Sequence, residues 1–151
     1  MHAKLVVLFL LALPFPSLAD DSARIIRVID GDTVEAEING EFDRIRLLRI
    51  NTPEMTDTRP DVLELARASR LALERLVLNH VVTLEYDRVR RDKYGRILAH
   101  LHRADGLWVN REMVRLGFAE IMTIPPNVKH TDELLAAERE AREGKRGLWR
   151  D

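Results

Sequence analysis

The sequence predicts one α+β domain, mainly β, built as a five-stranded Greek-key barrel of the OB-fold type with three helices. Three observations support this architecture. Five short stretches rich in β-branched and apolar residues are separated by turn residues, an amphipathic helical stretch follows the third, and two further helical stretches follow the fifth. An OB-fold carries its helix between the third and fourth strands, so the order of the elements favours this fold.

The first three strands form a predicted meander. Residues 24–29 are β-branched and apolar, residues 33–38 alternate, and the Asp-Gly-Asp triplet at 30–32 between them is typical of a turn. Asn-Gly at 39–40 is a strong hairpin signal, and it leads into a third strand over residues 42–50.

A helix is predicted from residue 62 to about residue 80, where apolar side chains recur at helical spacing. It is preceded by Asp61, which with Glu64 resembles a capping box. The later elements are strands over 81–86 and 97–102, a short helix over 110–116, and a final amphipathic helix over 131–144 that we expect Thr131 to cap.

Residues 1–19 have the features of a secretory signal peptide. Lys4 gives a positive start, residues 5–13 are an unbroken apolar run, and residues 17–19 suit a signal peptidase that cleaves after Ala19. The alternative is an uncleaved N-terminal anchor, but the run is short for a membrane span and prolines close it early. The mature domain is then residues 20–151, secreted or periplasmic in a bacterium, with no stable membrane association.

The charge balance excludes a global basic field. The chain has 24 basic and 25 acidic residues, and only Lys4 is lost with the signal, so the mature domain has a net charge of −2. Any polyanion must therefore bind a local cluster. Arginine makes up 20 of the 24 basic residues; it suits phosphate, but it is also common in high-GC genomes. With no cysteine, the core must hold by packing alone.

Residues 44–54, RIRLLRINTPE, place an arginine on either face of the third strand, so whichever face is buried carries one. A buried guanidinium needs a partner. It could form a structural ion pair with Asp43 or Glu35, or it could lie at the barrel rim and face an anion. The following Asn-Thr-Pro-Glu could simply start a helix. The triplet at 30–32 is likewise either a plain turn or a source of oxygen ligands for a hard cation.

Two further clusters also allow two interpretations. Residues 88–96, RVRRDKYGR, place five basic residues around Tyr94, either as a solvated loop or as a phosphate contact with a stacking surface. His100 and His102 share a strand face and could bind a transition metal, although exposed strand histidines are the favoured interpretation.

Taken in order, the motifs resemble those of the staphylococcal (micrococcal) nuclease family. The motifs are VIDGDT at 28–33, RLLRINTPE at 46–54, DKYGR at 92–96, VNREMVRLGFA at 109–119 and GLW at 147–149. Several motifs in the right order are more specific than any one alone. The resemblance implies an OB-like five-stranded barrel with three helices, and a calcium-dependent endonuclease that cleaves DNA and RNA and leaves 3′-phosphate products.

The resemblance also implies roles for single residues. Arg46 and Arg96 match the two catalytic arginines of the family, and Glu54 matches the proposed general base. Lys93 and Tyr94 match residues near the terminal phosphate of the substrate. Arg46 would then leave the core for the mouth of the active site.

One calcium ion is implied, with Asp32 as the principal carboxylate ligand and the backbone carbonyl of Thr52 as another. Asn51 stands where the family usually has a second carboxylate, so we expect weaker calcium binding or compensation by Asp30. The loop over 122–127 lacks the tyrosines that pack on the base in the well-known family member, so base stacking should be weaker.

We therefore expect an exported, monomeric, calcium-dependent phosphodiesterase with low sequence specificity. One alternative is a catalytically weak or inactive OB-fold module that binds nucleic acid, which Asn51 favours. A second is an exported interaction domain without any nucleic-acid role, which leaves the combination of Asp32, Arg46, Glu54 and Arg96 unexplained. The enzyme requires these four side chains to converge on one concave site.

Overall fold

The computed structural model describes residues 20–150, and the predicted signal peptide lies outside them. Five strands close into a barrel in the order β1-β2-β3-β6-β5, with β1 also paired to β5. They are β1 Asp21–Asp30, β2 Thr33–Ile38, β3 Glu41–Leu47, β5 Val81–Glu85 and β6 Ile97–Arg103. Neighbours are antiparallel except for the parallel pair β3 and β6. This topology confirms the predicted OB-fold.

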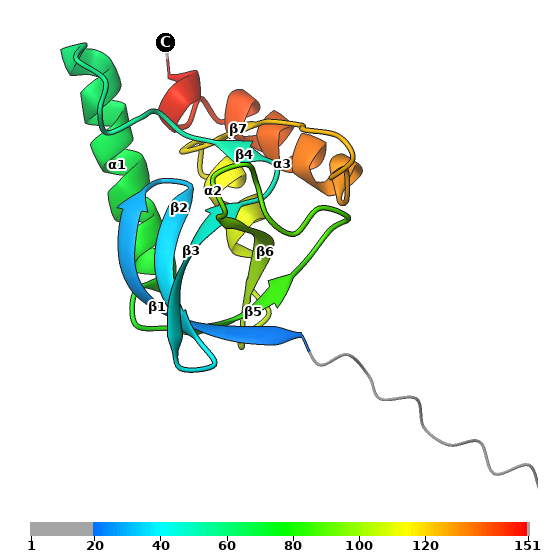
Figure 1. Ribbon diagram of the computed structural model, residues 1–151. Helices are drawn as coiled ribbons and strands as arrows, with labels where there is room; N and C mark the ends of the chain where they lie inside the picture. Colours follow the sequence, from blue (N-terminus) through cyan, green and yellow to red (C-terminus); the bar gives the residue numbers. More distant parts are fainter. Residues whose placement is uncertain (1–19, 151) are drawn as a thin grey trace, which may run out of the picture.

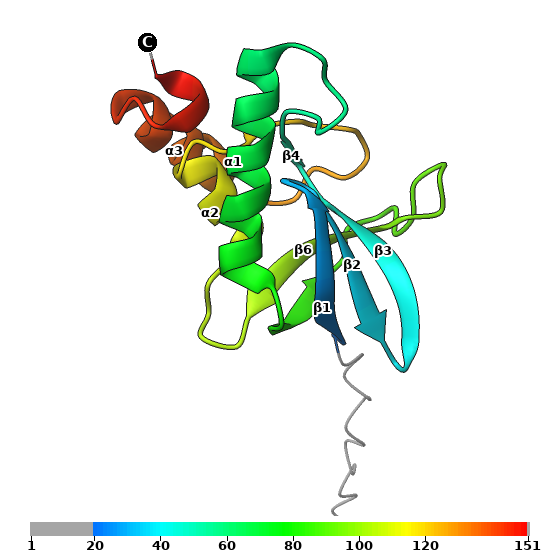
Figure 2. The same cartoon turned by 90° about the vertical axis from the view of Figure 1, so that its left-hand side faces the viewer.

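Three helices accompany the barrel, and two short strands pair beside it. They are α1 Pro60–Val77, α2 Val109–Arg115, α3 Thr131–Glu143, β4 Ile50–Asn51 and β7 Glu120–Ile121, followed by the short 3-10 helix η1 Gly147–Trp149. In Figures 1 and 2, α1 stands along the barrel beside β1, while α2 and α3 pack together at the end that also carries β4 and β7. None of the helices within residues 20–150 has the length and apolar character that a membrane crossing requires.

A single hydrophobic core joins the barrel interior to the helices. Inward-facing aliphatic side chains come from all five barrel strands and from one face of each helix, as period-two and helical spacing require. Fully buried examples are Ile25, Val34, Ile45, Leu84 and Leu101 from the strands, and Leu73, Met113 and Leu134 from the helices.

The predicted third strand over 42–50 is wrong at its end. β3 stops at Leu47, the chain turns at Leu48 and Arg49, and β4 begins at Ile50. Arg49 adopts a left-handed conformation with φ 65°, which breaks the strand alternation. The sequence does not predict β7, the partner of β4, because a two-residue strand has no periodicity to detect.

Two predicted helix caps are also wrong. α1 begins at Pro60, one residue before the supposed capping box at 61–64, because the fixed φ of proline and its missing N–H suit the first helical position. Thr131 begins α3 without capping it, since its hydroxyl donates instead to the backbone carbonyl of Val128 at 2.9 Å.

Candidate active site

A cavity of about 550 Å³ opens between the end of β3, the loop over residues 86–96 and the loop over residues 122–131. In Figure 2 the 86–96 loop, between β5 and β6, extends out from the barrel. Of the predicted site residues, those that line the cavity are Asp32, Arg46, Glu54, Lys93, Tyr94 and Arg96. The arginines therefore share one concave site, as the enzyme interpretation requires. Asn51 and Thr52 do not line the cavity, but they contact two residues that do, Arg46 and Asp32 respectively.

Asp32 is fixed by a set of donors that leaves its carboxylate almost no freedom. It is only 2% exposed. Its Oδ2 accepts from the N–H of Thr52 at 3.0 Å and from the Thr52 hydroxyl at 3.2 Å, and its Oδ1 accepts from Thr33 at 3.0 Å. Arg46 Nη2 lies 3.1 Å from Oδ2. The barrel register explains this contact, because Thr33 is paired with Arg46 across β2 and β3.

Gly31 is required by close packing in the turn that carries Asp32. A Cβ at this position would lie 2.7 Å from Ser69 Cβ and 2.8 Å from Thr52 Cγ2. The glycine thus lets the turn lie against α1 and the 52–54 segment. Next to it, burial and the nearby charges of Asp32 and Glu54 raise the pKa of Asp30 to about 7.

Arg46 is the arginine of β3 that is buried. It is 8% exposed, and its partner is Asp32 rather than Asp43 or Glu35. Its Nη1 donates to the carbonyls of Leu47 at 2.7 Å and Ile50 at 2.8 Å, so the same group closes the turn between β3 and β4. Arg46 therefore lies buried in the cavity wall, and not free at its mouth.

The structural ion pairs expected for the third strand are made by other arginines. Arg44 lies on the outside of the barrel and pairs with Glu35 at 3.3 Å. Asp43 pairs with Arg91 at 2.7 Å. The predicted acidic partners are thus taken by exposed arginines, while the buried Arg46 pairs with Asp32.

Glu54 and Arg96 approach the cavity from opposite loops. Glu54 is exposed, and its carboxylate makes no hydrogen bond or ion pair with the described part of the chain. Arg96 Nε donates to Asp92 at 2.8 Å, which leaves both Nη groups for another partner. Burial alone would raise the pKa of Asp92, but hydrogen bonds from Arg96 and from neighbouring backbone N–H groups hold it below its usual range.

Tyr94 is a flat, open surface beside these groups. Its side chain is 71% exposed, with Lys93 Nζ 5.1 Å and the Arg96 guanidinium carbon 5.4 Å from its ring centroid. Because Lys93, Tyr94 and Arg96 all line the cavity, the 88–96 loop is part of the site and not only a solvated connection.

The oxygen donors around Asp32 fit a hard divalent cation by type. They are the carboxylates of Asp30 and Asp32, the amide oxygen of Asn51 and the carbonyl of Thr52. Burial is the main reason that the pKa of Asp30 is raised, and the charge of Asp32 adds to it; a cation would offset that charge. Within residues 20–150, however, no three His, Cys, Asp or Glu side chains come together closely enough to hold a metal ion by themselves.

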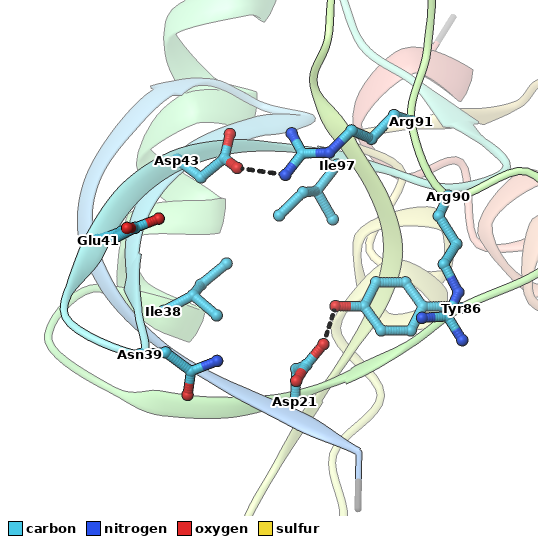
Figure 3. Close-up of a pocket in the computed structure, with 9 residues that line it drawn as sticks. All are labelled: Asp21, Ile38, Asn39, Glu41, Asp43, Tyr86, Arg90, Arg91 and Ile97. Atoms are coloured by element: carbon cyan, nitrogen blue, oxygen red, sulfur yellow. Dashed lines mark hydrogen bonds and ion pairs between the residues drawn. The ribbon is translucent and has the colours of Figure 1, made fainter. Parts of the chain in front are cut away.

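A second cavity, of about 290 Å³, is lined in part by Tyr86, Arg90 and Arg91 of the 86–96 loop. Arg91 lines both cavities. Figure 3 shows the Asp43–Arg91 ion pair and the Tyr86–Asp21 hydrogen bond at its walls. The hydrogen bond is 2.6 Å long, and Arg90 stacks over the ring of Tyr86 at 4.5 Å. These contacts anchor the loop that carries Lys93, Tyr94 and Arg96 to β1 and β3.

The histidines do not lie where the sequence suggests. His100 is completely buried beside Trp108 and His130, and neither of its ring nitrogens has a hydrogen-bond partner. The prediction of exposed strand histidines is therefore wrong for His100. His102 is partly exposed, and its Nε2 lies 2.7 Å from Glu85.

Two residues near the cavity are not among those that the sequence singles out. Arg49 lines the cavity and is 5% exposed, and the strand face expected for it is lost at the turn. Asn127 is 4% exposed and hydrogen-bonds the N–H and the carbonyl of Val89 at 2.8 and 2.9 Å. No local pattern distinguishes such an asparagine from a turn residue.

Comparison with known proteins identifies the family. Residues 44–151 match the family model described as staphylococcal nuclease homologue. The chain is 38% identical over 150 residues to an "Uncharacterized endonuclease" of Escherichia coli, covering 98% of this chain and 90% of that protein. It is 33% identical over 129 residues to the "Thermonuclease" of Staphylococcus intermedius, covering 85% and 76% respectively. The chain belongs to the staphylococcal nuclease family.

Proposed function

We propose that the protein is an exported, metal-dependent nuclease that hydrolyses phosphodiester bonds of DNA and RNA with low sequence specificity. The observation that carries the proposal is the presence of Asp32, Arg46, Glu54 and Arg96 around one cavity large enough for a nucleotide. The names of the relatives, a thermonuclease and an endonuclease, support it. We further propose 3′-phosphate products, cleavage of the signal after Ala19, release into the periplasm or medium, and a monomeric state.

The arginines suit the charge that develops during phosphodiester hydrolysis. The substrate phosphate is already anionic, and attack by water adds negative charge in a five-coordinate transition state. Arg96 would donate both Nη groups to phosphate oxygens, because Asp92 occupies only its Nε. Arg46 keeps its Nε free of hydrogen bonds within residues 20–150 and is held in place by Asp32 and two carbonyls.

Glu54 would accept a proton from the attacking water. Its carboxylate is exposed at the cavity and unengaged within residues 20–150, so a water molecule can reach it. Asp32, Asn51 and Thr52, with Asp30 beside them, would hold one Ca²⁺ ion. Bound there, the cation would offset the charge of the phosphate. Lys93 and Tyr94 would contact the terminal phosphate and its nucleotide.

The test uses the mature protein, residues 20–151, with single-stranded DNA, double-stranded DNA and RNA. Calcium is titrated from micromolar to tens of millimolar, beside an EDTA control. The variant is Glu54→Gln, and the matched control is Glu64→Gln, an exposed glutamate on α1 outside the cavity. We expect cation-dependent cleavage with 3′-phosphate ends, reduced by roughly 10²–10⁴-fold in Glu54→Gln and unchanged in Glu64→Gln.

Binding without cleavage would overturn the proposal. If the protein binds these nucleic acids but cuts none of them with calcium, magnesium or manganese, it is the binding module that Asn51 favours. Equal melting temperatures of Glu54→Gln and the wild type are required, so that a loss of activity reports on chemistry and not on folding.

A further inference from the structure

We propose that Arg49 is a positioning residue: it fixes the loop over residues 122–131, here named the wall loop, and so shapes the part of the cavity that receives the nucleotide. The inference rests on the proposed function of this cavity. Arg49 lies three residues after Arg46, in the turn between β3 and β4, and it lines the same cavity.

The guanidinium of Arg49 reaches both ends of the wall loop. Its Nη2 donates to the Thr123 hydroxyl at 2.9 Å. Its Nη1 donates to the Thr131 hydroxyl at 3.0 Å and to the carbonyl of Lys129 at 3.1 Å. Its own carbonyl accepts from the N–H of Met122 at 2.9 Å. One residue thus attaches the wall loop to the turn beside Arg46 at four points.

The middle of the wall loop forms the cavity wall. Its residues Ile124, Pro125, Pro126 and Asn127 all line the cavity. Asn127 also makes two hydrogen bonds with the backbone of Val89, in the loop that carries Lys93 and Tyr94. A displacement of the wall loop would therefore reach the phosphate-binding side of the site as well.

The turn between β3 and β4 does not by itself explain the presence of an arginine here. Its side chain is 5% exposed, it has no carboxylate within ion-pair distance among the described residues, and its buried Nε has no partner there. Its backbone has φ 65°, a conformation that Gly or Asn adopts more readily. Gly or Asn would suit a turn that only joined β3 to β4 better than an arginine does. The unfavourable backbone conformation and burial of Arg49 are therefore offset by the hydrogen bonds that its guanidinium makes with the wall loop.

The test distinguishes the effect of the Arg49 hydrogen bonds from the effect of its positive charge alone. Arg49→Asn keeps a residue that tolerates the left-handed backbone and removes the guanidinium. Arg49→Lys keeps the charge, but its single ammonium group cannot bridge the three acceptors. Thr123→Val removes one acceptor in a milder way. The matched control is Arg44→Asn, an exposed arginine on β3 whose partner Glu35 lies outside the cavity.

Three measurements are made on each variant: kcat and KM on a short single-stranded oligonucleotide with calcium, Kd for the same oligonucleotide in EDTA, and hydrogen exchange of residues 122–131. In Arg49→Asn we expect KM and Kd to rise about tenfold, kcat to change by less than about threefold, and exchange of the wall loop to accelerate. Arg49→Lys should behave like Arg49→Asn. Thr123→Val should raise KM and Kd by about threefold, and Arg44→Asn should match the wild type.

Recovery of the wild-type KM in Arg49→Lys would assign the effect to the positive charge and overturn the proposed positioning role. So would an unchanged exchange rate of the wall loop in Arg49→Asn, or a kcat that falls more than KM rises. The EDTA and exchange measurements do not need catalysis. If the wild type cleaves nothing, the proposed nuclease fails while these two measurements still decide the role of Arg49.

Discussion

Asn51 is the residue on which the strength of the proposed cation site depends. Its Nδ2 donates to Glu120 Oε1 at 3.3 Å, and its Oδ1 lies 3.5 Å from Arg46 Nη2. The amide therefore connects β4 to β7 and presents an oxygen toward Arg46 without adding charge. Calcium affinity follows the number of charged ligands, so a neutral amide here weakens the proposed site.

Asn51→Asp should raise the affinity for the cation and lower the stability of the metal-free protein. We expect the half-saturating calcium concentration to fall about tenfold, because the site gains a negative charge. Without calcium the melting temperature should fall, since the new carboxylate loses the hydrogen bond to Glu120 and faces its charge instead. Calorimetric calcium titration and thermal melting measure the two effects. Asn39→Asp, at the β2–β3 hairpin, is the control, and equal calcium affinity in the two variants would contradict the prediction.

Residue type and motif order predict six of the residues that line the cavity, but not the residues that hold them in place. Asp32, Arg46 and Arg96 can be selected because charged side chains in that order are specific to a chemistry. Arg49 cannot, because its role depends on a left-handed turn and on acceptors more than 70 residues away. The burial of His100 is equally hidden, because strand alternation says nothing about which distant side chains cover a face.

Among the elements, η1 docks on the end of α2 by contact between two backbones. Gly117 has φ +81°, and a Cβ there would lie 2.2 Å from the carbonyl oxygen of Arg146. The N–H of Leu148 donates to the carbonyl of Gly117 at 2.8 Å. The Arg142 guanidinium lies 3.6 Å from the Trp149 ring centroid, so α3 covers the docked segment.

Gly117→Ala should destabilise the fold more than an ordinary substitution at a left-handed glycine. We expect a loss of roughly 2–4 kcal/mol in the free energy of unfolding, from the backbone conformation and the forced separation of η1. Gly106→Ala isolates the first effect, because Gly106 has φ +88° and an added methyl group there would meet no atom of the described chain within 4 Å. Urea unfolding compares them, and equal losses in both variants would show that the close approach contributes nothing.

Strands and helices with several periods are predicted to within a few residues, whereas short or irregular elements are not. The body of α1 and the strand β2 follow directly from apolar spacing. β7 exists only because β4 lies next to it, and α1 starts at Pro60 for a reason unrelated to side-chain capping. Tertiary pairing and backbone restriction decide these cases, and neither is visible in periodicity.

At the scale of the whole molecule, a histidine cluster joins the barrel to α3. Glu85 on β5 lies 2.7 Å from Nε2 of both His102 and His130. Burial would raise the pKa of Glu85, but these two hydrogen bonds hold it below its usual range. His100 lies under them, its ring centroid 5.1 Å from that of His130, and burial lowers its pKa to about 4.

His100 should make the free energy of unfolding fall as the pH falls from 6.5 to 4, whereas Asp30, whose pKa is raised to about 7, should make it rise over the same range. In this window the unfolded chain binds a proton at His100 that the folded chain excludes, and the loss amounts to at most about 3 kcal/mol. His100→Phe fills the same space without titrating, so it should lose less stability than the wild type, or gain more, as the pH falls. Urea unfolding from pH 4 to 7.5 tests this against His80→Asn, an exposed histidine. A slope equal to that of the wild type in His100→Phe would rule out His100 as its source.

The double engagement of Arg46 has an evolutionary consequence. Its guanidinium closes the β3–β4 turn and holds Asp32, so selection for folding alone would retain it in a descendant that had lost catalysis. Glu54 has no such attachment, because its carboxylate makes no hydrogen bond or ion pair within residues 20–150. Random substitution would replace Glu54 first once selection for the reaction had ended. Under the proposed mechanism, the identity of that one glutamate across relatives of this protein would be a better record of surviving activity than Arg46.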